Sequence, residues 1–82
     1  MIINVKIFPI AGLCDKKQEL EFALGEGSLN EVLALAQERL KIRLDNNESI
    51  MFLHNGKGIG RHDDLIFKNG DELWLLPLLS SG

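Results

Sequence analysis

Residues 70–82, GDELWLLPLLSSG, decide how this chain folds. The run from Leu73 to Leu79 is strongly apolar and predicts a final strand over residues 72–77. Two serines and a glycine follow, so the sequence finishes in residues with small side chains. A closing strand needs no such tail, and we therefore expect the end of the chain to have a role of its own.

Two strands are predicted near the start of the chain. Residues 2–8 alternate, with three β-branched side chains on one face: Ile3, Val5 and Ile7. The opposite face carries Asn4, Lys6 and Phe8, and Pro9 ends the run. Residues 18–24 repeat the alternation with Leu20, Phe22 and Leu24 inward. Only a loop separates the two runs, so we expect a hairpin.

One helix is predicted within residues 26–40, EGSLNEVLALAQERL. Ser28 is a suitable N-cap, and Glu31 three residues later completes a capping box. The apolar residues recur at helical spacing and form one stripe: Leu29, Val32, Leu33, Ala36 and Leu40. The polar stretch 45–49 that follows the helix region is expected to be a loop.

The region before the final strand is predicted to be mostly irregular. Residues 50–54, IMFLH, form a short and largely buried strand that the Asn55-Gly56 turn ends. Residues 56–70 are expected to be irregular, with Leu65 and Phe67 tucked under the sheet.

These elements predict a two-layer α+β domain, because a helix with one apolar stripe covers one face of a sheet. Their order is that of the β-grasp, or ubiquitin-like, fold: a mixed sheet of four to five strands with one main helix packed on one face. In that fold the first and last strands lie side by side and parallel at the centre. We expect residues 1–82 to form a single domain, with 77–82 as a flexible C-terminal tail.

Composition limits the partners and the compartment. The net charge is −3 and the pI is near 5.2, so nucleic acid and anionic membrane are not expected as partners. Cys14 is the sole cysteine, which excludes an intrachain disulfide and an iron–sulfur cluster held by four cysteines. Without a signal-like leader, the expected location is the cytoplasm.

Motifs for chemistry within the domain are weak. Residues 55–60, NGKGIG, lack the Ser or Thr and the following helix of a phosphate-binding loop, so a plain loop is expected. Four polar residues suggest a metal site but lack zinc-ligand spacing, and we interpret them as ordinary surface residues: His54, His62, Asp63 and Asp64. Cys14 has no evident orienting partner for nucleophilic catalysis. The chain is therefore not expected to be an enzyme by itself, and no bound metal or cofactor is predicted.

The apolar excess around the last strand is a stronger signal. Trp74 and Leu76 share one face of that strand, and Phe8 has the same parity on its neighbour. If the helix covers the other face, these three residues either lie beneath irregular segments or form an exposed patch for a partner protein.

With these features, the sequence resembles the MoaD/ThiS family of sulfur-carrier proteins, and within it the small subunit of molybdopterin synthase. The resemblance spans the whole chain and is carried by Asn55-Gly56, by NGDELWLLP at 69–77 and by the small residues at the end. Pro77 favours the molybdopterin branch over the thiamine branch.

The resemblance implies chemistry at the C-terminal carboxylate of Gly82. A ubiquitin-activating-type adenylyltransferase would use ATP to adenylate it, and a sulfur source would convert it to a thiocarboxylate. The tail would then enter the large subunit of molybdopterin synthase, or another sulfur acceptor. Phe8, Trp74 and Leu76 would dock the partner, and the inserted tail would comprise Pro77, Leu78, Leu79, Ser80 and Ser81.

Two departures from the family pattern fall in this tail. Ser81 stands where the family has the first of two glycines, and Leu78-Leu79 replace Pro-Val. Ser81 restricts φ where glycine does not. The sequence leaves open whether Ser81 permits activation and whether the acceptor is molybdopterin, tungstopterin, thiamine, tRNA or a protein lysine. A ubiquitin-like modifier joined through Gly82, and an interaction module without terminal chemistry, are the alternatives.

Overall fold

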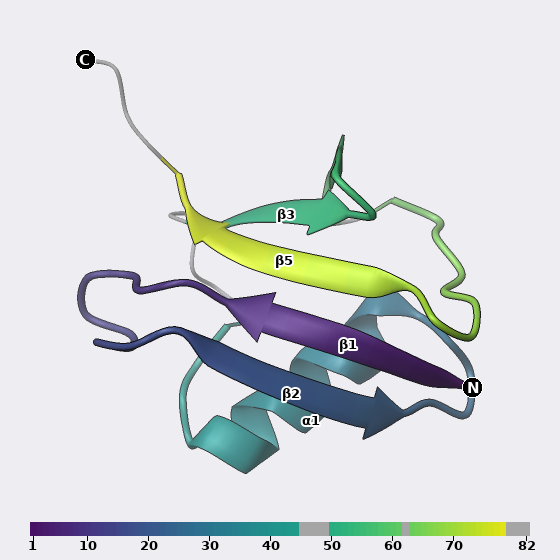
Figure 1. Ribbon diagram of the computed structural model, residues 1–82, viewed down its shortest axis with the longest axis horizontal. Helices are drawn as coiled ribbons and strands as arrows, with labels where there is room; N and C mark the ends of the chain where they lie inside the picture. Colours follow the sequence, from purple (N-terminus) through teal and green to yellow (C-terminus); the bar gives the residue numbers. More distant parts are fainter. Residues whose placement is uncertain (45–49, 62, 79–82) are drawn as a thin grey trace.

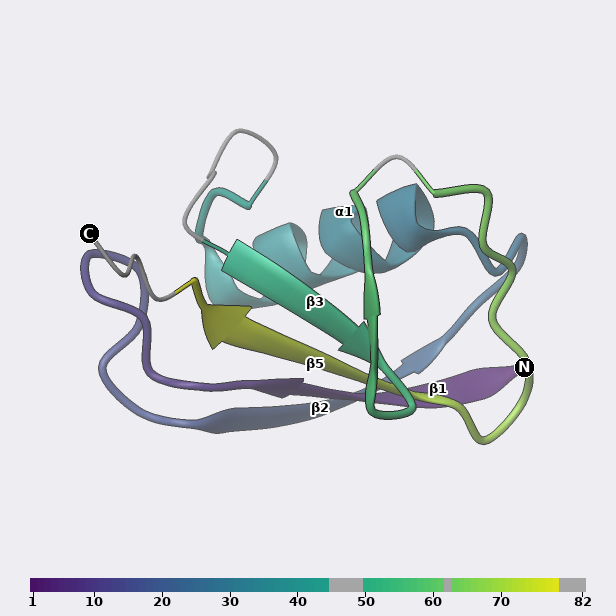
Figure 2. The ribbon, with the colours of Figure 1, turned by 90° about the horizontal axis from the view of Figure 1, so that it is seen from above.

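The computed structural model describes residues 1–44, 50–61 and 63–78, which form a five-stranded sheet with one helix on one face (Figure 1). The elements follow the chain as β1 (Ile2–Ile7), β2 (Gln18–Ala23), α1 (Leu29–Leu40), β3 (Ile50–His54), β4 (Lys57–Ile59) and β5 (Glu72–Pro77). The strand order across the sheet is β2-β1-β5-β3-β4. Figure 2 shows α1 lying along one side of the sheet, as the single apolar stripe predicted.

The centre of the sheet is a parallel pair, β1 and β5. Val5 lies opposite Leu73 and Ile7 lies opposite Leu75. All four side chains are fully buried. Parallel neighbours need a long crossover, and here α1, β3 and β4 lie between them in the chain. The predicted side-by-side arrangement of the first and last strands is confirmed.

The hairpin of β1 and β2 also follows the prediction. The strands are antiparallel, with Ile3 opposite Phe22 and Val5 opposite Leu20. Phe22 and Leu24 are buried and Leu20 is half-buried, so their inward direction is confirmed. Strand β2 ends at Ala23, and the Leu24 N–H donates to the Met1 carbonyl at 2.8 Å.

Helix α1 begins at the predicted N-cap, Ser28, but only half of the predicted capping box forms. The Ser28 hydroxyl accepts from the Glu31 N–H at 3.1 Å, which is the expected half of the motif. The Glu31 carboxylate instead accepts from the N–H groups of Gly25, Glu26 and Gly27, at 2.7 to 2.9 Å. The expected contact with the Ser28 N–H is therefore replaced by three contacts that hold the loop before the helix.

Strands β3 and β4 correct the prediction for residues 55–60. The plain loop is wrong, because Lys57–Ile59 pair with β3 as an antiparallel strand. Asn55 and Gly56 both have positive φ, 50° and 85°. Two consecutive positive φ values are the geometry of a tight two-residue hairpin, and Asn-Gly is its strongest sequence signal. The pair therefore starts a new strand as well as ending β3.

The segment between β4 and β5 closes the helix side of the core. Phe67 is fully buried, Leu65 is partly buried, and the Phe67 N–H donates to the Gly27 carbonyl at 2.7 Å. Gly27 has φ of 83°, and a Cβ there would lie 3.1 Å from the Phe67 carbonyl oxygen. The placement of Phe67 beneath the sheet is confirmed, and this close approach explains the glycine.

The hydrophobic core lies between α1 and the helix-facing side of the sheet. The stripe on α1 is confirmed, with Leu40 only partly buried and the other members fully or nearly buried: Leu29, Val32, Leu33 and Ala36. The strands contribute Ile3, Val5, Ile7, Phe22, Ile50, Phe52, Leu73 and Leu75 to this core.

The loop predicted at 45–49 lies outside the described residues. Within the described ranges, no helix has the length and hydropathy to cross a bilayer.

Candidate functional site

The sheet face opposite α1 carries the three residues that the sequence assigns to docking. Phe8 and Trp74 are in contact, with ring centroids 5.2 Å apart at an angle of 55°. Leu76 follows Trp74 on the same face of β5, and all three side chains are half-buried. The structure therefore brings the predicted residues together on a partly exposed surface.

Strand β3 adds two residues that the sequence interpretation missed. Met51 lies opposite Leu76 and Leu53 lies opposite Trp74, so both share the face with them. Met51 is 37% exposed and Leu53 is half-buried. The prediction of a largely buried strand is corrected, because alternate residues face away from the core. We call these five residues the docking face: Phe8, Met51, Leu53, Trp74 and Leu76.

Charged side chains hold the aromatic part of the docking face. The Lys6 ammonium lies 5.5 Å from the Trp74 ring centroid, 3.8 Å from Glu19 Oε1 and 3.6 Å from Glu72 Oε1. The Trp74 indole N–H donates to the same Glu72 oxygen. Trp74 is thus oriented by a cation on its face and an acceptor at its edge, although its ring remains partly exposed.

The start of the predicted tail is partly described. Pro77 is the last residue of β5 and pairs with Ile50, so it belongs to the sheet rather than to the tail. Leu78 follows and is 53% exposed. The other predicted tail residues, Leu79, Ser80, Ser81 and Gly82, lie outside the described residues. The described chain therefore leaves the sheet beside Leu76, at one end of the docking face.

His54 is not the ordinary surface residue that we expected. Its Nε2 lies 2.8 Å from Asp71 Oδ2, and the two side chains are only 18% and 16% exposed. Its ring also packs edge-on against Phe67, with centroids 4.9 Å apart. This pair is structural, because it links the end of β3 to the turn before β5. No three His, Cys, Asp or Glu side chains converge on a metal position in the described ranges, which exclude His62.

Cys14 takes part in a local turn. Its thiol donates to the Phe8 carbonyl at 3.4 Å, and its backbone bridges to Ile10. The half-buried thiol is thereby held in the loop between β1 and β2, which fits the interpretation of a small packing residue.

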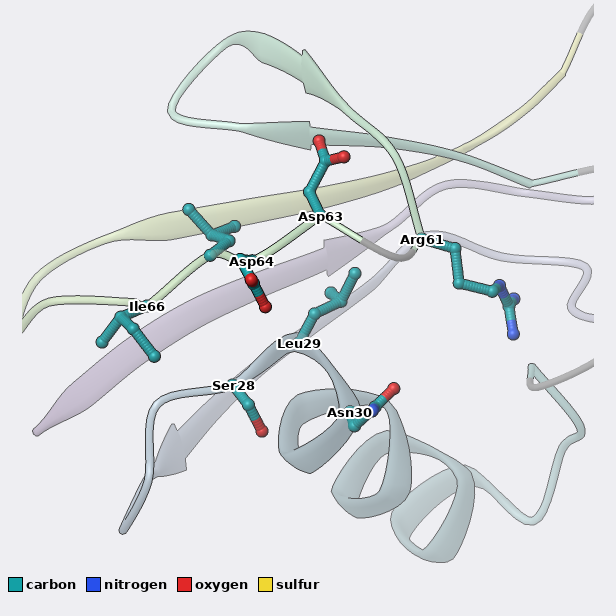
Figure 3. Close-up of a pocket in the computed structure, with 8 residues that line it drawn as sticks. Ser28, Leu29, Asn30, Arg61, Asp63, Asp64 and Ile66 are labelled. Atoms are coloured by element: carbon teal, nitrogen blue, oxygen red, sulfur yellow. The ribbon is translucent and has the colours of Figure 1, made fainter.

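A pocket of about 320 Å³ lies at the start of α1, away from the docking face (Figure 3). It is lined by Ser28, Leu29, Asn30, Arg61, Asp63, Asp64, Leu65 and Ile66. Two of its polar groups already serve the fold: Ser28 caps α1, and Asp63 accepts from the Gly60 N–H at 2.8 Å. Figure 3 shows the Asp63 and Arg61 side chains pointing in different directions, so they do not converge on one ligand.

Two solved structures match the whole chain. One is from the protein–protein complex of subunits 1 and 2 of molybdopterin-converting factor from Helicobacter pylori 26695, at TM-score 0.65 and 21% identity. The other is SAMP1 from Haloferax volcanii, at TM-score 0.66 and 20% identity. Each alignment covers 100% of both chains. The chain has the ubiquitin-like β-grasp fold.

This β-grasp assignment confirms the fold class predicted from the order of elements. No protein-family model matches the chain, and no curated protein sequence matches it significantly. At identities near 20%, the likeness to these structures establishes the β-grasp fold alone.

Proposed function

We propose that this protein is a sulfur carrier for molybdopterin synthesis, activated at the carboxylate of Gly82. One observation carries the proposal: strand β5, which supplies Trp74 and Leu76 to the docking face, leads directly into residues 78–82, which end in two serines and a glycine. A partner that covers the docking face would therefore meet the tail as it leaves the sheet. Residues 78–82 reach up to about 17 Å when extended, at about 3.3 Å per residue, which is enough to enter a buried site.

The chemistry requires little from the β-grasp domain itself. A carboxylate is a poor electrophile, so an adenylyltransferase would join it to AMP from ATP and release pyrophosphate. A hydrosulfide equivalent from a sulfur donor then attacks the carbonyl carbon and displaces AMP. The product is a thiocarboxylate, in which one oxygen has been replaced by sulfur. The protein acts as the substrate of its activating enzyme and as an accessory subunit of the synthase.

The match to a chain from the complex of two molybdopterin-converting factor subunits supports a large-subunit partner. The docking face is suited to such a partner, because its five residues are apolar and contiguous across β3, β5 and the residue that follows β1. In the carrier, Gly82 at the end removes the Cβ that would crowd the attacking sulfur.

Mass spectrometry of the intact chain tests the proposal. The protein, ATP, a sulfur donor and the adenylyltransferase of the same organism should give the mass gain of one oxygen-to-sulfur exchange. Ser81→Gly should react at least as fast, because it restores the two-glycine end. A chain lacking Gly82 should not react. The proposal fails if the native chain gains no mass, and reaction of Ser81→Gly alone would show that Ser81 blocks the native chain.

A ubiquitin-like modifier remains the alternative, because the same activated Gly82 can acylate a lysine of another protein. The two functions differ in their product. The carrier gives a free thiocarboxylate that disappears as sulfur reaches the pterin, whereas a modifier gives isopeptide-linked adducts that survive denaturation. Tryptic peptide mapping of cell lysates distinguishes them, because a modified lysine would carry residues 69–82, the remnant left by cleavage after Lys68.

A further inference from the structure

A shallow groove of about 370 Å³ lies beside the docking face, across β2, β1 and β5. It is lined by Asn4, Val5, Lys6, Glu19, Leu20, Glu21 and Glu72. Glu72 belongs to both surfaces, because it lines the groove and accepts from the Trp74 indole. A partner that covers Trp74 must therefore place atoms at the mouth of this groove.

The charges in the groove are unevenly compensated. Lys6 lies between Glu19 and Glu72 and pairs with both. Lys17, at the rim of the groove, also pairs with Glu19, with 3.5 Å between Nζ and Oε1. Glu21 is exposed, and in the described part of the chain its carboxylate has neither an ion pair nor a hydrogen bond. The groove therefore has three carboxylates and only two ammonium groups, and Glu21 is the carboxylate whose negative charge is not paired by a described residue.

The strand register places this excess in one row. Glu21 lies opposite Asn4 on one side, and Glu72 lies opposite Asn4 on the other. The Asn4 side chain is exposed and, within the described ranges, has no polar partner. Both contacts of Glu72, with Lys6 and with Trp74, use Oε1. Oε2 of Glu72, the Asn4 amide oxygen and the Glu21 carboxylate thus lie on one surface and accept no hydrogen bond from another described residue.

We propose that the partner of the docking face inserts an arginine or lysine side chain over Asn4, between Glu21 and Glu72. A guanidinium suits this row, because its several N–H groups diverge in one plane and accept no hydrogen bond. The neighbouring docking face would receive apolar side chains of the same partner. The inference rests on the proposed function, since it specifies the chemistry of the large subunit that would bind this face.

The cation also gives the complex its orientation. An apolar patch alone tolerates several rotations of a partner, whereas a charge placed to one side of it favours a single one. The row lies toward the start of β5, and the tail leaves from the opposite end of that strand. Pairing at Asn4 and insertion of the tail would therefore fix both ends of the carrier on its partner.

Titration calorimetry with the cognate large subunit of molybdopterin synthase tests the inference. At low salt, Glu21→Gln should weaken binding about threefold, as expected for one partly exposed ion pair. Adding Asn4→Ala should bring the loss to about tenfold. The difference from the native chain should shrink at high salt, since screening weakens the pair. Glu38→Gln, an equal charge change on the exposed side of α1, should leave binding unchanged.

Reversal of charge identifies the partner side chain. Glu21→Lys should weaken binding further than Glu21→Gln, and an arginine or lysine changed to glutamate on the large subunit should restore it. Native binding without any loss in the Glu21→Gln and Asn4→Ala chain would overturn the inference. An absence of native binding would overturn it too, while the mass assay on Gly82 would still judge the sulfur-carrier proposal.

Discussion

The Nε2 atom of His54 lies 2.8 Å from Oδ2 of Asp71, and this contact joins the end of β3 to the turn before β5. The same carboxylate accepts from the Lys68 N–H at 2.8 Å and from the Asn55 side-chain amide at 3.1 Å. Asn55 in turn accepts from the Glu72 N–H at 2.8 Å. One carboxylate thus fixes the two turns that begin β4 and β5.

Acid should weaken this junction. The Lys68 N–H, followed by His54 and Asn55, lowers the pKa of Asp71 from 3.8 to about 2. Because the folded pKa lies below the unfolded one, the contribution is fully present above about pH 4 and is lost as pH falls toward 2. We expect Asp71→Asn to lower the free energy of unfolding at pH 7 by on the order of 2 kcal/mol.

Urea unfolding across the acid range measures this effect. The difference between the native chain and Asp71→Asn should shrink between about pH 4 and pH 2, as the native carboxyl becomes protonated. Asp15→Asn, in the exposed loop between β1 and β2, is the matched control and should show a much smaller difference. A difference for Asp71→Asn that does not change with pH would contradict the assignment.

The loop before α1 should depend on the Glu31 carboxylate. Hydrogen bonds from the N–H groups of Gly25 and Gly27 lower the pKa of Glu31, so its contribution is present above its ordinary pKa and lost below it. Glu31→Gln should lower the melting temperature at pH 7 and have little effect in acid. Ser28→Ala should cost about 1 kcal/mol at both pH values, because its hydroxyl does not titrate there.

Thermal unfolding followed by circular dichroism distinguishes these two parts of the cap. Glu38→Gln on the same helix removes an equal charge from an exposed position and serves as the control. If Glu31→Gln and Glu38→Gln melted alike at pH 7, the three contacts with the preceding loop would not contribute to stability.

Neighbouring residues of β5 should respond oppositely to truncation, because they face opposite sides of the sheet. Leu75 is fully buried against α1, so Leu75→Ala should cost about 2–5 kcal/mol in unfolding free energy. Leu76 lies on the docking face and is half-buried, so Leu76→Ala should cost much less and should weaken partner binding instead. Equal losses of stability in both variants would contradict the assignment of faces.

The sequence determined this fold well where side-chain periodicity is strong. Alternation in β1 and β5 and the apolar stripe of α1 identified the core residues. The order of the strands and the helix along the chain then indicated the topology. The prediction from periodicity was wrong at β4, because the short Lys57–Ile59 segment contains Gly58 and shows no alternation of apolar and polar residues. The signal there was Asn55-Gly56, whose hairpin geometry outweighs the low strand propensity of glycine.

The site was predictable to a smaller extent. Phe8, Trp74 and Leu76 follow from parity within two neighbouring strands, whereas Met51 and Leu53 depend on the register of β3 against β5. Register across a long connection is set by tertiary packing and is not visible in a local pattern. The same holds for His54 and Asp71, which are 17 residues apart in the sequence and meet only because β3 and β5 pair.

Gly58 should tolerate a side chain without loss of stability. It lies opposite Leu53, its φ is not in the left-handed region, and an added Cβ would meet only Leu53 Cδ2 at 3.9 Å. Gly58→Ala should therefore keep or raise the unfolding free energy, by up to about 1 kcal/mol. Gly56→Ala is the contrasting variant, since its φ of 85° makes alanine destabilising. Urea unfolding of both chains measures the contrast.

Trp74 should report directly on the docking face, because it is the sole tryptophan of the chain. Its ring is half-buried against Phe8 and Lys6, so a partner that covers the face changes its surroundings. Protein grown with 5-fluorotryptophan should give one ¹⁹F resonance, which shifts and broadens when the cognate large subunit is added. Tryptophans of the unlabelled partner do not contribute to this signal.

A second ¹⁹F label, far from the docking face, distinguishes docking from the slower tumbling of the complex, which broadens every resonance. Cys14 is the sole cysteine and lies in the loop between β1 and β2. In a Cys14→Ser chain, a trifluoromethyl tag on Ala34→Cys, which is exposed on α1, should broaden with complex size but keep its chemical shift. If calorimetry shows saturation while the Trp74 resonance keeps its free position, the partner binds elsewhere and the docking face is wrongly assigned.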